Sequence, residues 1–231
     1  TTYYFLSCDL GPGKRIQIEE NNLTEFNYNV LSYDAYLFYE KDMLNLVNTG
    51  RQFFGESFAF NPYQTFTHNL DYLDLSEPID LTVRVAAKSS SGSSFNIGNN
   101  SNQLATLYVS GISSNSNDYY RTSLLEENFV TNSNNLSISF NYNNAGNSSA
   151  LAWLDYYRLV FRNNLIFDSS QFLFRDSKSV GSNMTSKFSI TSDYNNLKVW
   201  NITDPLNPIE IQLIEDNLTG VFSFITLTDT L

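Results

Sequence analysis

The chain has one cysteine, Cys8, and one histidine, His68, and these are its only candidates for a nucleophilic Cys–His pair. Such a pair needs a thiolate held beside an imidazole. Cys8 falls at the end of an expected strand, and His68 alternates with Phe66 and Leu70 as in another strand. This placement favours a half-buried cysteine and an incidental histidine. We therefore assign no catalytic residue, and a lone cysteine excludes an internal disulfide.

Carboxylates gather at two places. Asp71, Asp74 and Glu77 share one expected loop, and Glu126 and Glu127 share another. Calcium takes oxygen ligands of this kind, but the spacing of an EF-hand loop is absent. The pattern favours solvated acidic loops, with calcium as the one ion they could hold. A zinc site is excluded because four nitrogen and sulfur ligands are not available. We assign no metal-binding and no cofactor-binding residue.

The run LAWLDYYRL, residues 151–159, carries aromatic rings that could stack on sugars. That function would need Trp153 or Tyr157 at the surface. The alternative that we favour is that both rings fill the core. In that case Asp155 is a buried or edge carboxylate and needs partners, such as Arg158 or backbone N–H groups.

Alternation of apolar and polar residues with a period of two predicts the strands that position these side chains. In Ile79–Lys88 the apolar set faces one way, with Ala86 as the exception, and residues 136–142 repeat the pattern. Such strands bury one face and expose the other. Residues 103–110 and 151–162 are apolar on both faces, which predicts central strands. Loops rich in Ser, Asn and Gly separate the strands, so we expect an all-β, antiparallel, jelly-roll-like sandwich.

The segment before the sandwich fits two structures. A helix could begin at Asp34 and end at Gly50, with one face formed by Tyr36, Tyr39, Met43, Leu46 and Val47. Residues 36–40 are also aromatic enough for a strand. We favour an extended start followed by one short helix over residues 42–48.

Three parts are expected along the chain. Residues 1–50 would lead into the sandwich, residues 51–168 would form it, and residues 169–231 would form a smaller β unit. Within that unit the strands are expected at residues 171–175, 187–190, 197–200, 209–214 and 221–226. Asp204-Pro205 and Asn207-Pro208 supply turns between them.

Composition limits the function classes. Hydrophobic residues make up 42% of the 231 residues, which is enough for a substantial core. The net charge of −11 disfavours binding to nucleic acid and to anionic lipid. No run of about twenty apolar residues is present, so we expect no membrane-spanning helix.

Five ordered segments are more specific than the composition: YEKD at 39–42, GRQFFGESF at 50–58, VRVAA at 83–87, WLDY at 153–156 and VWNITDP at 199–205. Together they resemble the PorU-like sortases of the type IX secretion system, which are gingipain-type cysteine peptidases of Bacteroidetes. In that family the corresponding runs look like YEKD, SGREWFGE, LDYI and VWDVTDP. Phe53 replaces the usual Trp and Asn201 the usual Asp, and both departures are conservative.

The resemblance implies that these residues are β-domains upstream of a peptidase domain that they do not contain. The parent would lie at the outer-membrane surface, remove C-terminal sorting domains from secreted cargo and help attach a surface glycolipid. The implied partners of the fragment are its own downstream peptidase domain, secreted cargo and other secretion components. The fragment itself would not be an enzyme.

Two other functions remain open on the residues alone. A carbohydrate-binding module would need two or more exposed aromatic rings, and exposure of Trp153 and Trp200 would separate it from the accessory portion of a peptidase. An adhesin or structural surface domain would show neither glycan binding nor a link to a peptidase.

Overall fold

The computed structural model describes residues 11, 13–168, 171–216 and 218–228. It is almost entirely β-structure, as expected, and it divides into two units. The larger unit is Ser32–Asn164, and the described residues before and after it form the smaller one. This division differs from the expected boundaries at 50 and 168, because β2 (Tyr28–Val30) pairs with β12 (Thr185–Ser192) in the smaller unit. Among the described residues, no helix has the length and hydropathy needed to cross a membrane.

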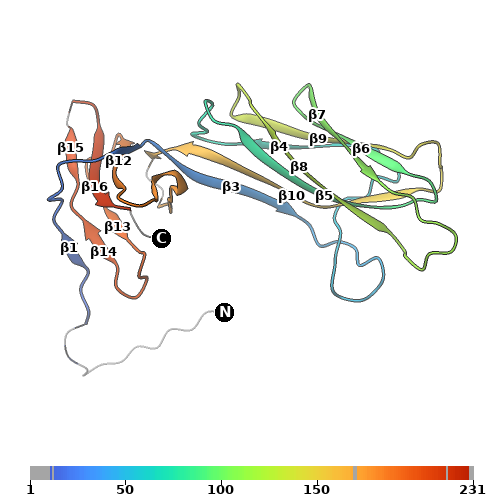
Figure 1. Cartoon of the computed structure of the whole chain (residues 1–231), viewed down its shortest axis with the longest axis horizontal. Helices are drawn as coiled ribbons and strands as arrows, with labels where there is room; N and C mark the ends of the chain where they lie inside the picture. Colours follow the sequence, from blue (N-terminus) through green and yellow to red (C-terminus); the bar gives the residue numbers. More distant parts are fainter. Residues whose placement is uncertain (1–10, 12, 169–170, 217, 229–231) are drawn as a thin grey trace. The chain divides into compact units, whose positions relative to one another are not determined.

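The larger unit is a sandwich of two four-stranded antiparallel sheets (Figure 1). One sheet has the order β3 (Ser32–Glu40), β10 (Leu151–Asn164), β5 (Ile79–Lys88) and β8 (Arg121–Phe129). The other has the order β4 (Tyr63–Asn69), β9 (Asn135–Asn143), β6 (Ser93–Asn99) and β7 (Asn102–Val109).

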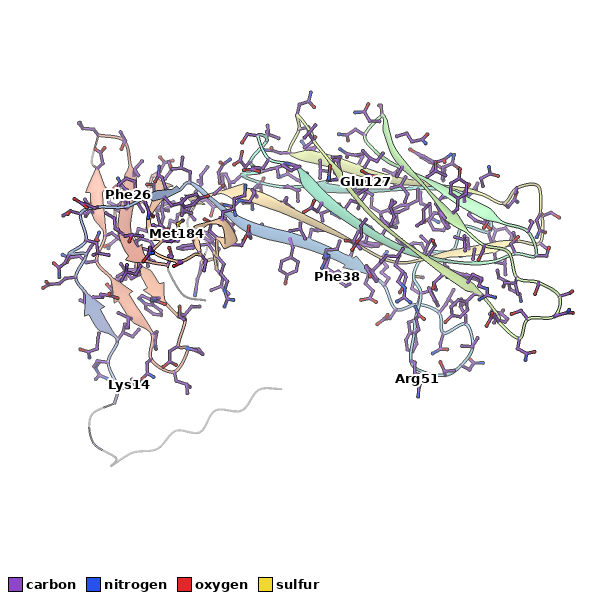
Figure 2. The ribbon with its side chains drawn as sticks, viewed as in Figure 1. Lys14, Phe26, Phe38, Arg51, Glu127 and Met184 are labelled. Carbon is purple, nitrogen blue, oxygen red and sulfur yellow. The ribbon has the colours of Figure 1, made fainter. Side chains whose placement is uncertain are left out.

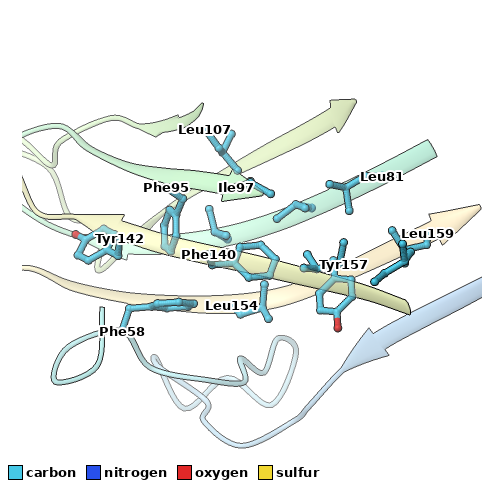
Figure 3. Packing of buried hydrophobic residues seen from close by; sticks show 14 of the residues in the cluster. Phe58, Leu81, Phe95, Ile97, Leu107, Phe140, Tyr142, Leu154, Tyr157 and Leu159 are labelled. Atoms are coloured by element: carbon cyan, nitrogen blue, oxygen red, sulfur yellow. The ribbon is translucent and has the colours of Figure 1, made fainter. Parts of the chain in front are cut away.

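The core fills the space between these sheets (Figure 3). Alternation along β5 sends Leu81, Val83 and Val85 inward, where they meet residues such as Ile97 and Phe140 of the other sheet. Each of these side chains is almost fully buried. Removing a side chain of this size from water contributes about 1.5–3 kcal/mol, so this core is the main source of the fold's stability.

Of the two segments predicted to be central strands, residues 151–162 lie in a strand, β10, that is central in its sheet. β10 pairs with β3 on one side and with β5 on the other. The prediction for residues 103–110 was wrong, because β7 pairs only with β6 and lies at the edge of its sheet. An edge strand leaves part of its apolar run half-exposed, and Tyr108 is 74% exposed.

Residues 34–50, for which the sequence allowed a helix or a strand, begin as an extended strand and contain no helix over residues 42–48. The strand expected at residues 36–40 is the second half of β3. Beyond it, Leu44 forms an antiparallel bridge with Phe54, with N–O distances of 2.9 and 2.8 Å between their backbones. Asn48 and Gly50 adopt positive φ angles of 53° and 68°, which reverse the chain between the two bridge residues. The backbone groups that a helix would use are therefore paired across a loop.

The smaller unit contains two sheets of short strands. One has the order β1 (Gln17–Glu19), β14 (Ile209–Ile211) and β13 (Val199–Asn201). The other has the order β11 (Ile166–Phe167), β12, β16 (Val221–Leu227) and β15 (Ile214–Asp216), with β2 also beside β12. Phe188 and Phe224 stack at 4.9 Å across β12 and β16.

The strand predictions for this unit were partly right. The segments at 187–190, 197–200 and 221–226 overlap β12, β13 and β16. The segment at 209–214 is divided between β14 and β15, which belong to different sheets. Residues 171–175 form no strand, and the only described helical element is the 3-10 turn η1 (Ser177–Ser179).

Candidate functional site at the covered face of the sheet

A β-bulge at Asp155 changes the direction of the side chains along β10. Leu154 pairs with Val85 and Tyr156 with Arg84, so Asp155 is the extra residue. A bulge shifts the alternation of the strand by one position. Leu154 and Tyr157 therefore both enter the main core, although they are three residues apart. Trp153 belongs instead to a separate cluster, on the outer face of the sheet.

A loop covers that outer face. We call residues 41–58 the covering loop. Its second half lies along β10: Gly55 N donates to Leu154 O at 2.8 Å, Leu154 N to Glu56 O at 3.0 Å, and Phe58 N to Ala152 O at 2.9 Å. β5 pairs with one side of β10, and β3 pairs with the other side as far as Glu40. Residues 55–58 take over that second side of β10 where β3 ends.

The covering loop buries a small apolar cluster of Phe54, Ala86 and Trp153. The Phe54 ring meets the Tyr120 ring edge-on at 5.1 Å. This cluster explains why Ala86, which breaks the alternation of β5, is apolar on an outward position. Trp153 is 5% exposed, and Tyr157 is fully buried in the main core, as favoured for both rings. Neither ring is available to stack on a sugar.

Asp155 is held by two side chains that the sequence analysis did not name as its partners. Gln52 Nε2 donates to its Oδ2 at 2.9 Å, and Arg84 Nη1 lies 3.3 Å from the same oxygen. The suggested partner, Arg158, instead donates to Thr82 Oγ1 at 3.3 Å. Burial raises the pKa of Asp155, and the Gln52 hydrogen bond and the Arg84 charge oppose that rise. Tyr120 donates to Gln52 Oε1 at 3.1 Å and extends the network.

A second polar group closes the base of the covering loop. Glu56 Oε1 accepts from Tyr39 Oη at 2.5 Å and pairs with Lys41 Nζ at 2.8 Å. Burial alone would raise the pKa of Glu56. The hydrogen bonds from Lys41 and Tyr39 outweigh this effect and hold the pKa below its usual value. The same bond to Glu56 raises the pKa of Lys41.

Four of the five quoted segments therefore supply the two polar groups that hold the covering loop. Tyr39 and Lys41 come from YEKD, Gln52 and Glu56 from GRQFFGESF, Arg84 from VRVAA, and Asp155 from WLDY. Charged or amide residues inside apolar runs were the signal that could have identified this network. The fifth segment forms β13 and a turn in the smaller unit, where Asn201 Oδ1 accepts from Thr203 N at 3.0 Å. An aspartate oxygen would accept the same bond.

His68 lies on β4, and its Nε2 is 2.5 Å from the hydroxyl of Tyr157. Burial lowers the pKa of His68, so the neutral imidazole is favoured. Burial also raises the pKa of the Tyr157 hydroxyl, which stays protonated. Cys8 lies outside the described residues, so the absence of a catalytic Cys–His pair stays a prediction.

Of the two acidic groups, only the one with Asp71, Asp74 and Glu77 lies in a loop, and the loop expected at Glu126 and Glu127 was wrong because both lie on β8. Asp74 Oδ1 accepts from Ser76 N at 3.1 Å and from Ser76 Oγ at 2.6 Å, and Asp71 Oδ1 accepts from Asn69. Glu126 and Glu127 are neighbours on β8 and point to opposite faces. Within the described residues, no three or more His, Cys, Asp or Glu side chains are grouped to hold a metal ion. Calcium stays a prediction.

The outer part of the covering loop presents apolar side chains to solvent. Met43 is 63% exposed, and Leu44, Val47 and Phe53 are also exposed. Arg51 lies at the outer turn of this loop (Figure 2). In this arrangement the charged groups at the base are paired with one another, while the apolar groups at the tip face water.

The chain is similar in structure to the crystal structure of dimeric latent PorU from Porphyromonas gingivalis. The match covers 93% of this chain with a TM-score of 0.74 and 18% sequence identity. The chain has a PorU-like fold. It spans about a fifth of the length of that protein, since the match covers 20% of the PorU chain. At this identity the likeness concerns the fold alone.

Two carbohydrate-binding modules share a weaker likeness with part of the PorU-like fold. The CBM36-1 domain of a multidomain xylanase from the hindgut metagenome of Trinervitermes trinervoides matches 55% of this chain and 95% of its own, with a TM-score of 0.37 and 16% identity. CBM35 from Cellvibrio japonicus Abf62 matches 56% and 99%, with a TM-score of 0.36 and 12% identity. Likenesses this weak carry no argument. No protein-family model and no curated protein matches the chain.

Proposed function

We propose that this chain is a non-catalytic β-region of a gingipain-type cysteine peptidase of the type IX secretion system. In this proposal it lies at the outer-membrane surface and either supports the peptidase domain or docks secreted cargo. The observation that carries the proposal is that four ordered sequence segments supply the two polar groups that hold the covering loop. The PorU-like fold over 93% of the chain supports it.

The covering loop is the surface that we propose for docking. Loops on a rigid β-scaffold commonly carry binding functions. A loop that is already fixed before binding loses little conformational entropy when a partner arrives. Gln52 and Glu56 fix its second half, and Lys41 fixes its start. The exposed side chains of Met43, Val47 and Phe53 would then be buried against the partner.

The first experiment compares cleavage by the parent polypeptide with and without residues 1–231. The substrate is a peptide that spans the junction before a cargo sorting domain. We expect cleavage by the intact parent, no cleavage by residues 1–231 alone, and weaker or absent cleavage by the shortened parent. Cleavage by residues 1–231 alone would contradict a non-catalytic role.

The second experiment tests the docking surface. Binding of the 231-residue chain to the separate peptidase domain and to a cargo sorting domain is measured by calorimetry. The triple change Met43→Ser, Val47→Ser and Phe53→Ser should weaken binding to one of the two partners about tenfold or more. The matched control is Tyr36→Ser with Leu124→Ser, which removes exposed apolar groups from β3 and β8. Equal loss in both variants would remove the covering loop from the proposal.

A carbohydrate-binding module is the second candidate, and one residue favours it. Trp200 on β13 is exposed, whereas the other rings considered for sugar stacking are buried. Titration of the chain with soluble glycans while tryptophan emission is recorded tests this function. A large change in emission that is lost in Trp200→Phe would favour the module over the accessory region.

A further inference from the structure

A second surface of the sandwich includes no residue of the covering loop. It is a cleft of about 600 Å³ formed where β6, β7 and β9 of one sheet approach β8 of the other. We call it the hydroxyl cleft because its side chains include Ser93, Ser94, Tyr108, Thr122, Ser123 and Asn143. Ser94 lies between Tyr108 and Asn143 in one row across the sheet.

We propose that the hydroxyl cleft binds a short neutral saccharide. This proposal does not depend on the proposed role in secretion. It rests on the cleft's lack of charge, on a buried hydroxyl that has no partner, and on an exposed aromatic ring, which we take in turn.

None of the ten residues that line the cleft is charged. An anion would find no Lys or Arg in the cleft, and a metal cation would find no carboxylate. A purely apolar ligand would leave the hydroxyl and amide groups without hydrogen bonds, which is unfavourable. A neutral ligand with many hydroxyl groups meets each of these conditions.

Ser93 supplies the observation that points most directly to a ligand. The residue is 5% exposed, and its Oγ has no hydrogen-bond partner. The Tyr142 hydroxyl next to it belongs to the main core, where burial raises its pKa and the Ser93 side chain lowers it. Buried hydroxyl groups are normally paired with protein or with an ordered molecule. A sugar hydroxyl that enters the cleft could form a hydrogen bond with Ser93 Oγ.

Tyr108 supplies a stacking surface at the same cleft. Its side chain is 74% exposed on the edge strand β7. Aromatic rings at binding surfaces offer an apolar face beside a polar end, which suits the C–H face of a sugar ring. Clefts that hold small ligands usually measure about 300–1,000 Å³, so the size of this one fits a few sugar units.

The test is a titration of the isotope-labelled 231-residue chain, followed by backbone amide shifts. The probes are xylotetraose, cellotetraose, mannotetraose and chitotetraose. We expect at least one to shift the amides of Ser93, Ser94, Tyr108 and Asn143. Tyr108→Ala should weaken that binding about threefold to tenfold. The control, Tyr36→Ala, removes an equally exposed ring from β3 and should leave the affinity unchanged.

Ser93→Ala separates binding from folding. The change removes a hydroxyl whose only indicated contact is a weak one with Tyr142, so thermal stability should change little. Affinity for the probe should still fall by a similar factor. The proposal is overturned if none of the four probes shifts these amides, or if the shifts map to β3 or to Trp200 instead. It is also overturned if Ser93→Ala and Tyr108→Ala bind like the unchanged chain.

Discussion

The amide of Gln52 donates a 2.9 Å hydrogen bond to Oδ2 of Asp155, which lies 103 residues further along the chain. This bond joins the covering loop to the bulge in β10. Asp155 is 3% exposed, so its carboxylate depends on Gln52 and on Arg84 for the interactions that water would otherwise supply.

Asp155→Ala should therefore lower the free energy of unfolding by about 1–3 kcal/mol, because it leaves the Gln52 amide without its acceptor and removes the partner of Arg84. Urea unfolding followed by circular dichroism measures the change. Asp155→Asn keeps an acceptor oxygen at this position, so its free energy of unfolding should fall by less than that of Asp155→Ala. The control is Asp118→Ala, which breaks an exposed pair with Arg121 and should cost about 0–1 kcal/mol. Equal losses at the two aspartates would mean that the bulge network contributes little.

Gly55 is the closest approach between the covering loop and β10. A Cβ added there would lie 3.1 Å from Lys41 O and 3.5 Å from Leu154 O, both of which are backbone atoms. Backbone cannot move aside as a flexible side chain can, so Gly55→Ala should destabilise the chain by about 1–3 kcal/mol. It should also release the covering loop, which limited proteolysis between residues 41 and 58 would detect.

Gly92→Ala is the matched control for Gly55→Ala. A Cβ at Gly92 would meet only Val109 O, at 3.8 Å, which is an ordinary contact. We expect little change in the urea midpoint and in the rate of proteolysis. If Gly55→Ala is as stable and as resistant as Gly92→Ala, the loop is not held at this point.

Period-two alternation predicted two of the regular strands but not the polar groups that join the strands to the covering loop. The predicted Ile79–Lys88 is the full extent of β5, and residues 136–142 lie within β9. The bulge was hidden, because one inserted residue makes β10 apolar on both faces, as in a regular central strand. Gln52 and Arg84 stand out as polar residues inside apolar runs, but they are distant in sequence and no local pattern indicates that they pair with Asp155. Ala86 was the one local sign that the outer face of β5 is covered.

The single histidine of the chain makes one part of the pH dependence assignable. Burial lowers the pKa of His68 from its usual 6.5, so the unfolded chain binds this proton more readily than the folded one. Its contribution to stability is therefore present above about pH 6.5 and is lost as the pH falls below that value. Burial raises the pKa of Asp155, which acts in the opposite sense and stabilises the fold as the pH falls.

His68→Gln isolates the histidine contribution. The free energy of unfolding is measured in urea at pH 7.5 and at pH 5.5. Between these two values it should fall more for the unchanged chain than for His68→Gln. Glutamine can still bond the Tyr157 hydroxyl, so the comparison does not leave that buried group without a partner. Parallel pH profiles for the two chains would show that His68 titrates alike in the folded and unfolded states.

The two tryptophans should report separately on the two units. Trp153 is buried under the covering loop, whereas Trp200 is 47% exposed on β13. In Trp200→Phe the remaining emission comes from Trp153 and should be blue-shifted and poorly quenched by iodide, because water and ions do not reach the ring. In Trp153→Phe the emission of Trp200 should lie at longer wavelength, with quenching several-fold stronger. Circular dichroism of both variants checks that the fold is kept. Strong quenching of Trp153 in a folded Trp200→Phe chain would mean that the covering loop opens in solution and that the apolar cluster with Phe54 is not permanently closed.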